Sequence, residues 1–514
     1  MSQTLIVIVL VLYFGVLVGI SLLTSRKANN ESFFRGDKKS PWYLVSFGMI
    51  GASLSGVTFL SIPGWVGDAA KQFSYMQVVF GYLVGYFIVA YVLLPLFYRS
   101  NVTSIYEYLQ DRFGFWSYKT GAFFFLISRI IGASIRLLLV ANVLQSVLFE
   151  DWGIPFEVTV IISILLIWIY TSRGGIKTIV WTDSLQTLFM LSSVILTVYF
   201  ISNALDLPEK GGIITAVENS GNAKMFFFDD FLGGNYFWKS FLGGMFITIG
   251  MTGLDQDMMQ KNLSCKNIGD AQKNMISMAV VLVVVNLVFL ALGSLLYMYA
   301  EVNMPETIQA IADKKLGSDM LFSTIAMSDA VGPLVGILFL LGLVAAAYSS
   351  ADSALTSLTT SFSIDFLNLK RKRRAEQERT RRMVHVGMSV VLVLVIILLK
   401  YTTNDSAIGL LLKFAGFTYG PLIGMFFFGI IFKRVLKDGL VPLICLASIL
   451  LTVALWYFSF GGPGIPKGEP GLFGKYVFGV EIIIFNSFFT FIGMWAVSKR
   501  NVNQLEEHES SIAR

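Results

Sequence analysis

The stretch 345–362, AAAYSSADSALTSLTTSF, places one acid and many hydroxyl side chains inside an apolar segment of membrane-spanning length. A carboxylate at the centre of a bilayer costs on the order of 3 kcal/mol, so Asp352 is expected to face the protein interior and to be neutralised there. Ser349, Asp352 and Ser353 are spaced i, i+3 and i+4, which puts their oxygens on one helix face. Hard oxygen ligands with one negative charge suit a small hard cation. The stretch therefore predicts a cation site; the alternative is ordinary Ser/Thr packing, with hydroxyls bonded to the preceding turn.

The composition is that of an integral membrane protein. Of the 514 residues, 55% are hydrophobic and only 14% are charged, which is not typical of soluble domains. Apolar runs of about 20 residues, each long enough to cross a ~30 Å hydrocarbon core, recur from end to end. The first run lacks the basic leading region and cleavage site of a signal peptide and is expected to be retained. We count thirteen runs, near residues 4–23, 43–63, 76–98, 119–149, 155–171, 178–203, 237–258, 274–300, 329–363, 383–401, 407–433, 439–461 and 474–498.

The distribution of basic residues predicts the orientation of the chain. Loops that follow odd-numbered segments carry most of the Lys and Arg, and the richest is KRKRRAEQERTRR at 370–382. Because basic loops stay on the cytoplasmic side, the N-terminus is expected outside and the tail, 499–514, inside a bacterial-type plasma membrane. The basic run is interpreted as this topological signal together with a contact to anionic lipid, and not as a nucleic-acid-binding segment.

Two segments carry the interruptions of broken membrane helices. The sequence GMIGASLSGVTFLSIPG at 48–64 contains four glycines, four hydroxyl residues and a proline, and FLGGMFITIGMTGLDQD at 241–257 is similarly interrupted. Broken helices occur at membrane depth only where the freed backbone lines a cavity, and transporters use such carbonyls to coordinate cations. Close helix packing through small residues is the alternative for the first stretch.

The spacing of the two interruptions predicts the domain organisation. They lie five segments apart, as two inverted five-helix repeats would place them. The expected fold is a single all-α transmembrane domain over 1–514 with about thirteen helices and a ten-helix (5+5) core. Its predicted parts are a leading helix at 4–23, a first repeat at 43–203, a second repeat at 237–433 and two peripheral helices at 439–498.

Two arginines lie within one apolar segment, FLISRIIGASIRLLLVANVLQ. Arg129 and Arg136 are spaced i, i+7 and therefore share a helix face. Intramembrane arginine indicates a functional site, and a carboxylate-bearing substrate would bind such a guanidinium in bidentate fashion. The alternatives are pairing with a structural acid and snorkelling to the interface.

Asp183 is a second acid expected within the membrane. If it approached Asp352, an interposed cation would be almost obligatory, because two bare carboxylates cannot share a dry site. The alternative is a pair with a basic residue at the inner mouth, such as Arg173 or Lys177.

The sequence resembles the sodium/solute symporter family of sodium-coupled proline, pantothenate, sialic acid, iodide and sugar transporters. The resemblance covers essentially residues 1–500 and rests on SIYEYLQDRFG, RGGIKTIVWTDSLQT, DQDMMQKNLSCKN and SSADSALTSLTTSFSIDFL. It implies the same ten-helix core. The main sodium site that the resemblance implies consists of carbonyls and hydroxyls of Gly51, Leu54, Ala346, Ser349 and Ser350. A possible second sodium site maps onto Asp183, Ser349, Asp352 and Ser353. Substrate candidates by position are Ser53, Ser55, Thr58, Tyr75, Gln77, Arg129, Asp255 and Phe417.

The expected function is sodium-coupled import of a small organic solute by alternating access. The arginines favour a carboxylate compound, such as an amino acid, a sialic-acid-like sugar acid or a short organic acid, and a neutral sugar is the leading alternative. An ion channel or sensor on the same fold is less favoured, because interrupted helices indicate an occluded midplane site and no nucleotide loop or soluble partner domain is present. The two cysteines and two histidines lie apart and predict no disulfide, no transition-metal site and no His-based catalysis, so no enzyme and no catalytic residues are expected.

Overall fold

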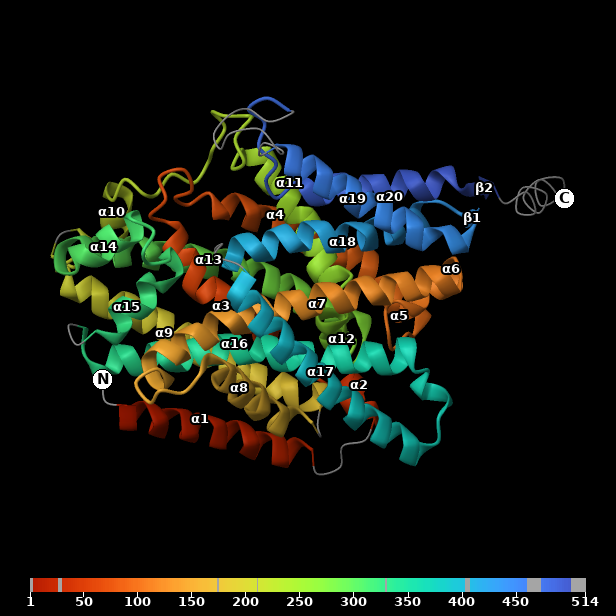
Figure 1. Cartoon of the computed structure of the whole chain (residues 1–514), viewed down its shortest axis with the longest axis horizontal. Coiled ribbons are helices and arrows are strands. Elements are labelled where there is room, and N and C mark those ends of the chain that lie inside the picture. The colour runs from red at the N-terminus through yellow and green to blue at the C-terminus, as the bar shows by residue number, and fades with distance from the viewer. Residues whose placement is uncertain are drawn as a thin grey trace.

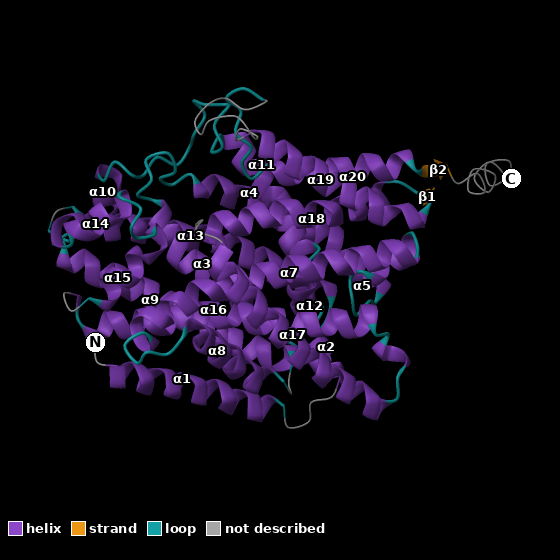
Figure 2. Cartoon of the chain, in the orientation of Figure 1, coloured by secondary structure: helices purple, strands orange, loops and turns teal. Residues whose placement is uncertain are grey.

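The computed structural model describes residues 3–25, 30–172, 175–209, 211–328, 331–402, 407–459 and 473–500. It confirms the all-α class: most long helices run along the longest axis of the molecule, and loops project beyond them, most visibly above α11 (Figures 1 and 2). The helices are α1 (Gln3–Thr24), α2 (Asn30–Arg35), α3 (Trp42–Trp65), α4 (Tyr75–Ile88), α5 (Leu94–Ser100), α6 (Glu107–Arg112), α7 (Phe115–Leu144), α8 (Phe156–Thr171), α9 (Ile176–Ala204), α10 (Gly212–Asn219), α11 (Phe237–Thr248), α12 (Gln256–Asn262), α13 (Ile268–Asn303), α14 (Pro305–Ala312), α15 (Leu321–Met327), α16 (Pro333–Ser361), α17 (Arg374–Thr402), α18 (Ala407–Ile431), α19 (Val441–Ser459) and α20 (Ile482–Ala496).

Two short strands were not predicted. β1 (Arg434–Leu436) and β2 (Ser498–Arg500) pair antiparallel, with Val435 opposite Lys499. They join the segments that follow α18 and α20, near the C-terminal end of the chain in Figure 1. The predicted tail lies outside the described residues beyond position 500.

Ten helices in the described ranges are long and apolar enough to cross a membrane. Two shorter apolar helices, α8 and α20, coincide with the predicted segments near 155–171 and 474–498. The predicted segment near 237–258 is divided into α11 and α12 by a π-helical turn at Ile249–Gly253. The chain is therefore a multi-pass membrane protein.

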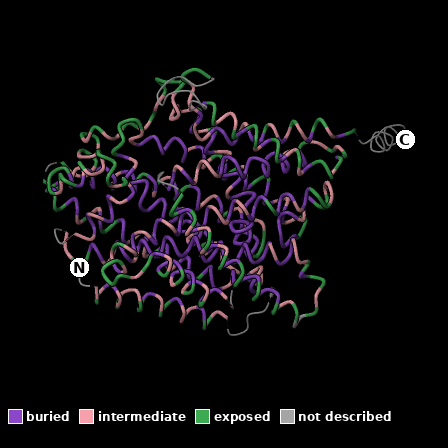
Figure 3. The backbone as a smooth tube through the Cα atoms, in the orientation of Figure 1, coloured by how far each residue is buried: buried purple, intermediate pink, exposed green. Residues whose placement is uncertain are grey.

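The buried core surrounds α3, which packs against α9, α13 and α16. Figure 3 shows buried backbone through the centre of the molecule and exposed stretches along its edges, where α1 lies at one side and α19 with α20 at the other. Large apolar side chains on the outer helices, including Leu12 of α1 and Leu450 of α19, are exposed. Such faces are suited to contact with lipid, because apolar side chains need no polar partner in the hydrocarbon interior of a bilayer.

Both predicted helix breaks are confirmed. Within α3, Ser55 has φ 46° and ψ 169°, which interrupts the helical backbone between its two halves. In the other broken helix, the π-helical turn after α11 leads to Asp255, whose extended backbone (φ −103°, ψ 122°) precedes α12. Because the backbone groups near these points lose their helical partners, they are available to line a cavity.

The small residues of α3 also serve helix packing, so both explanations offered for this stretch apply. A Cβ added to Gly51 would lie 2.1 Å from Thr187 Oγ1 of α9, and one added to Gly48 would lie 2.9 Å from Asp183 Cβ. These contacts bring the backbone of α3 directly onto α9. The first half of α3 is thus held against the helix that carries Asp183.

Candidate functional site

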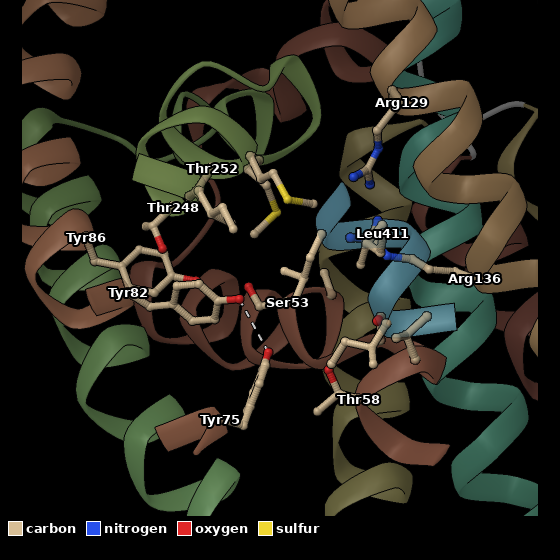
Figure 4. A pocket seen from close by; sticks show the side chains of 18 residues that line it. Ser53, Thr58, Tyr75, Tyr82, Tyr86, Arg129, Arg136, Thr248, Thr252 and Leu411 are labelled. Carbon is tan, nitrogen blue, oxygen red and sulfur yellow. Dashed lines mark hydrogen bonds between the residues drawn. The ribbon is translucent and has the colours of Figure 1, made fainter. Parts of the chain in front are cut away.

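A cavity of about 90 Å³ lies beside the break in α3. Side chains of α3, α4, α7, α11 and α18 line it, as do residues of the π-helical turn that follows α11. Figure 4 shows its two sides: the hydroxyls of Tyr75 and Tyr82 meet on one, and the guanidinium groups of Arg129 and Arg136 lie on the other. The two tyrosine oxygens are 3.4 Å apart. The cavity thus has hydroxyl groups on one side and two guanidinium groups on the other.

The structure brings five of the eight substrate candidates together in this cavity: Ser53, Ser55, Thr58, Tyr75 and Arg129. The other three do not line it. Gln77 holds a loop to α4, donating to the Asn235 carbonyl and accepting the N–H of Phe227 at 2.9 Å each. Phe417 packs with Phe478 and Ile482 of the C-terminal part of the chain.

Asp255, the remaining candidate, caps α12 rather than facing the cavity. Its carboxylate accepts the N–H of Asp257 at 2.9 Å and the hydroxyl of Tyr419 at 2.5 Å. Arg129 reaches the same two acids: its guanidinium is ion-paired with Asp257 and lies 3.9 Å from Asp255. Arg129 therefore joins α7 to the broken helix, which matches the expected alternative of a pair with a structural acid.

Arg136 lies two helical turns after Arg129 on α7, and its contacts differ from those of Arg129. Its side chain is only 6% exposed, and it makes no ion pair or hydrogen bond with the residues that the structure describes. It also lines the cavity. A buried guanidinium without an anion is costly, so this position is the one that would gain most from an anionic ligand. Arg136 shares a helix face with Arg129 but was not among the predicted substrate residues.

The predicted main cation site lies where α3 and α16 touch. The Ser350 hydroxyl of α16 is 3.4 Å from two carbonyl oxygens, those of Ala52 and Ala346. Gly51 immediately precedes Ala52, and Leu54 follows it by two residues, just before the break at Ser55. The carbonyl of Ala52 was not among the predicted ligands, although the predicted helix break, which frees several consecutive carbonyls, is a signal that includes it.

The predicted second site is divided between two carboxylates. Asp183 accepts the Ser349 hydroxyl at 2.8 Å and the ammonium of Lys261 at 2.7 Å, and all three side chains are at most 2% exposed. Asp352 instead accepts hydroxyls, from Tyr170 at 2.9 Å and Ser353 at 3.2 Å. A protein cation therefore neutralises Asp183, whereas Asp352 has hydroxyl partners.

The basic partner of Asp183 is not the one that the sequence suggested. Lys177, at the start of α9, pairs at 3.0 Å with Asp37, which lies in the segment before α3. Partial burial would raise the pKa of Asp37, but hydrogen bonds from Ser32 and Lys177 outweigh it and hold that pKa below its ordinary value. Arg173, the other suggested partner, lies outside the described residues.

The broken helices, the central cavity and the oxygen-lined contact beside it define a membrane transporter with a midplane site. The profile of the sodium:solute symporter family matches residues 33–444. The chain belongs to this family. It is therefore a sodium-coupled secondary active symporter for a small organic solute, with sodium as the co-transported ion, and the family to which it belongs consists of transporters.

Curated relatives cover most of the chain. It is 27% identical to a sodium/sialic acid symporter of Proteus mirabilis (strain HI4320), over 86% of this chain and 87% of the relative. It is 25% identical to sodium-coupled monocarboxylate transporter 2 of Homo sapiens, over 87% of this chain and 71% of the relative.

Solved structures agree in fold. A substrate-bound, outward-open Na⁺-coupled sialic acid symporter matches with a TM-score of 0.77 at 21% identity, over 96% of this chain and 99% of that one. Mhp1, a nucleobase-cation-symport-1 family transporter in a closed conformation, matches with a TM-score of 0.52 at 15% identity, over 91% and 94%. The ten-helix transporter fold expected from the sequence is thus shown.

Proposed function

We propose that this symporter carries a small organic carboxylate together with sodium, and that Arg136 binds the carboxylate. The observation that carries the proposal is the guanidinium of Arg136, buried in the cavity without an anionic partner among the described residues. A carboxylate would accept two parallel N–H bonds from it, which is the strongest common form of such recognition. Arg129 is less suited, because the acids of α12 already neutralise it.

The rest of the substrate would meet hydroxyl groups. Tyr75, Tyr82 and Tyr86 line the cavity opposite the arginines (Figure 4), and Thr58 lines it as well. These hydroxyl groups would bind hydroxyl or carbonyl oxygens of a sugar acid or a hydroxy acid. Relatives that carry sialic acid and monocarboxylates support a carboxylate substrate. A neutral sugar would leave Arg136 buried and unpaired, which disfavours that alternative.

Sodium would bind between the two halves of the core, at Gly51, Leu54, Ala346, Ser349 and Ser350. In support, Ser350 already lies between a carbonyl of α3 and one of α16. The same part of α3 lines the substrate cavity, since Ala52, Ser53 and Ser55 belong to its wall. A cation that joins α3 to α16 would thus fix the wall against which the substrate binds, and coupling would be reciprocal.

A second sodium would bind at Asp352, with Ser353, Ser349 and Asp183 around it. Because Lys261 pairs with Asp183, the attraction for this cation would come chiefly from the carboxylate of Asp352. The membrane potential would then add about 2.3 kcal/mol per 100 mV for each sodium charge that moves inward.

The proposed location is the plasma membrane, and the proposed transport is inward. Basic residues gather in loops at one end of the helices, which supports a plasma-membrane protein with its N-terminus outside and its C-terminus in the cytoplasm. The repeats would be 43–203 and 237–433, each beginning with one of the two broken helices.

The test is uptake into proteoliposomes of labelled monocarboxylates, sialic acid, amino acids and neutral sugars, with and without an inward sodium gradient. Ser350→Ala should raise the sodium concentration for half-maximal uptake about tenfold or more, because one polar ligand of a cation is worth about 1.5–3 kcal/mol. Ser357→Ala is the matched control, since Ser357 is buried on the same helix and its hydroxyl donates, within the described ranges, only to the Ala354 carbonyl. Accumulation without sodium, or of neutral sugars alone, would contradict the proposal.

A further inference from the structure

A second cavity, of about 470 Å³, shares no lining residue with the central cavity. Helices α1, α8 and α17 form it, and the side chains that matter for its chemistry are Leu22, Trp168, Ile169, Arg381 and Arg382. None of these residues lines the central cavity or belongs to the proposed sodium sites.

Arg381 supplies a buried positive charge. Its side chain is 6% exposed, and its Nε has no hydrogen-bond partner in the part of the chain that the structure describes. The guanidinium lies 4.3 Å from the centre of the Phe33 ring, which shields one face from water. The acid Glu378 on the same helix lies 3.8 Å from Arg382 instead. An anion is the ligand that would complete this site, since a buried guanidinium needs acceptors for its N–H groups.

The walls of the cavity are apolar and belong to membrane-spanning helices. Leu22 of α1 and Ile169 of α8 are 55% and 45% exposed, and Trp168 of α8, which is half-buried, is a residue type enriched at membrane–water boundaries. A free inorganic anion would gain nothing from these walls. A molecule with a phosphate at one end and hydrocarbon chains at the other would contact both the arginines and the apolar helices.

We propose that this cavity is a binding site for an anionic phospholipid. The phosphate pairs with Arg381 and Arg382, and an acyl chain lies along α1 and α8. Basic pockets between membrane helices are suited to anionic headgroups, and the cavity lies at the end of the basic run 370–382. The sequence suggested only that this run meets anionic lipid; the cavity assigns the contact to a particular guanidinium between particular helices.

The lipid site also touches the helix that carries the proposed sodium ligands. His385 lines the cavity, and its ring nitrogens lie 2.8 Å from the Thr359 hydroxyl of α16 and 3.2 Å from the Thr171 hydroxyl of α8. A bound lipid would therefore brace α8 and α17 at the point where they contact α16. The lipid site itself does not depend on the proposed substrate or on sodium.

Native mass spectrometry of the purified full chain tests the proposal, with phosphatidylglycerol and phosphatidylcholine titrated separately. We expect one tightly retained phosphatidylglycerol, at least tenfold weaker retention in Arg381→Gln, and no comparable phosphatidylcholine adduct. Arg379→Gln is the matched control, because it removes the same charge from an exposed position of α17. Equal losses in the two variants, or equal retention of both lipids, would overturn the proposal.

Two further measurements separate a lipid from a free anion and binding from folding. Inorganic phosphate at millimolar concentration should leave the phosphatidylglycerol adduct in place; displacement by phosphate would show an anion site without lipid specificity and would overturn the proposal. Ser172→Glu leaves Arg381 untouched but adds a carboxylate to the cavity lining. It should weaken lipid retention while the melting temperature in lipid-free detergent is unchanged, and undiminished retention would count against the site.

Discussion

Replacing Arg136 should weaken the binding of the substrate without lowering the stability of the fold. Because this guanidinium is buried and has no anionic partner among the described residues, Arg136→Gln removes a desolvated charge that the empty protein does not neutralise. The melting temperature without substrate should therefore stay the same or rise. With substrate, the same change leaves a carboxylate without its partner, which typically costs about 3–5 kcal/mol.

That cost corresponds to an increase in KM of roughly 10²- to 10³-fold or more. Arg136→Lys keeps the charge but loses the planar fork, so its KM should lie between those of the wild type and the Gln variant. Arg129→Gln is the contrasting control. It breaks the pair with Asp257, so it should lower the melting temperature even without substrate, because the acids of α12 would remain buried and unpaired.

The assay is initial-rate uptake of the labelled carboxylate at a fixed inward sodium gradient, combined with thermal unfolding of the same detergent-purified preparations. An Arg136→Gln variant with unchanged KM would refute the assignment of the carboxylate to this residue. A variant that unfolds several degrees earlier than the wild type without substrate would refute the argument that Arg136 is unpaired.

Gly51→Ala should lower the melting temperature by the equivalent of about 1–3 kcal/mol, because the new Cβ would meet Thr187 Oγ1 at 2.1 Å, and Thr187→Ala in the same chain should restore part of that loss, since the Cβ of residue 187 would still lie 3.1 Å away. Asp352→Asn should reduce the Hill coefficient for sodium in uptake from about two to about one, because it removes the carboxylate proposed for the second ion, and an unchanged coefficient would exclude that role. Burial raises the pKa of Asp319, whose carboxylate accepts the N–H of Ala407 at the start of α18. Its contribution to stability is therefore present below its ordinary pKa and is lost as pH rises through the folded value, so Asp319→Asn should melt higher than the wild type at pH 8 but not at pH 4.

The architecture was predictable because its signals are local. Apolar runs reveal the helices wherever they lie, and the glycines and hydroxyl residues around Ser55 identified the first break before its backbone was known. The interior position of Asp352 followed in the same way, from the cost of a carboxylate in lipid. These features depend on a residue and its neighbours along the chain.

The roles within the site were less predictable because they depend on partners from distant segments. Arg129 and Arg136 are equivalent in sequence spacing, and only the placement of α12 neutralises one of them and not the other. Lys261 of α12 is likewise the partner of Asp183. Its position close to a broken helix was a signal in the sequence that could have indicated this pair. Phe417 was expected at the substrate, but the segment around α20 covers it.

The pairing of charges around the broken helices bears on the number of sodium ions. Lys261 neutralises Asp183, and Arg129 lies against the two acids of α12. Asp352 and Arg136 remain without a charged partner within the described residues, one of each sign, at the places proposed for a cation and for a carboxylate. If every group has its ordinary charge, the four acids Asp183, Asp255, Asp257 and Asp352 outnumber the three bases Lys261, Arg129 and Arg136 by one. A carboxylate substrate with one sodium would leave that excess in place, whereas a carboxylate with two sodium ions would balance it. Since an uncompensated charge at membrane depth is costly, the arrangement favours two sodium ions for each carboxylate, and Asp352→Asn should shift the balance to one.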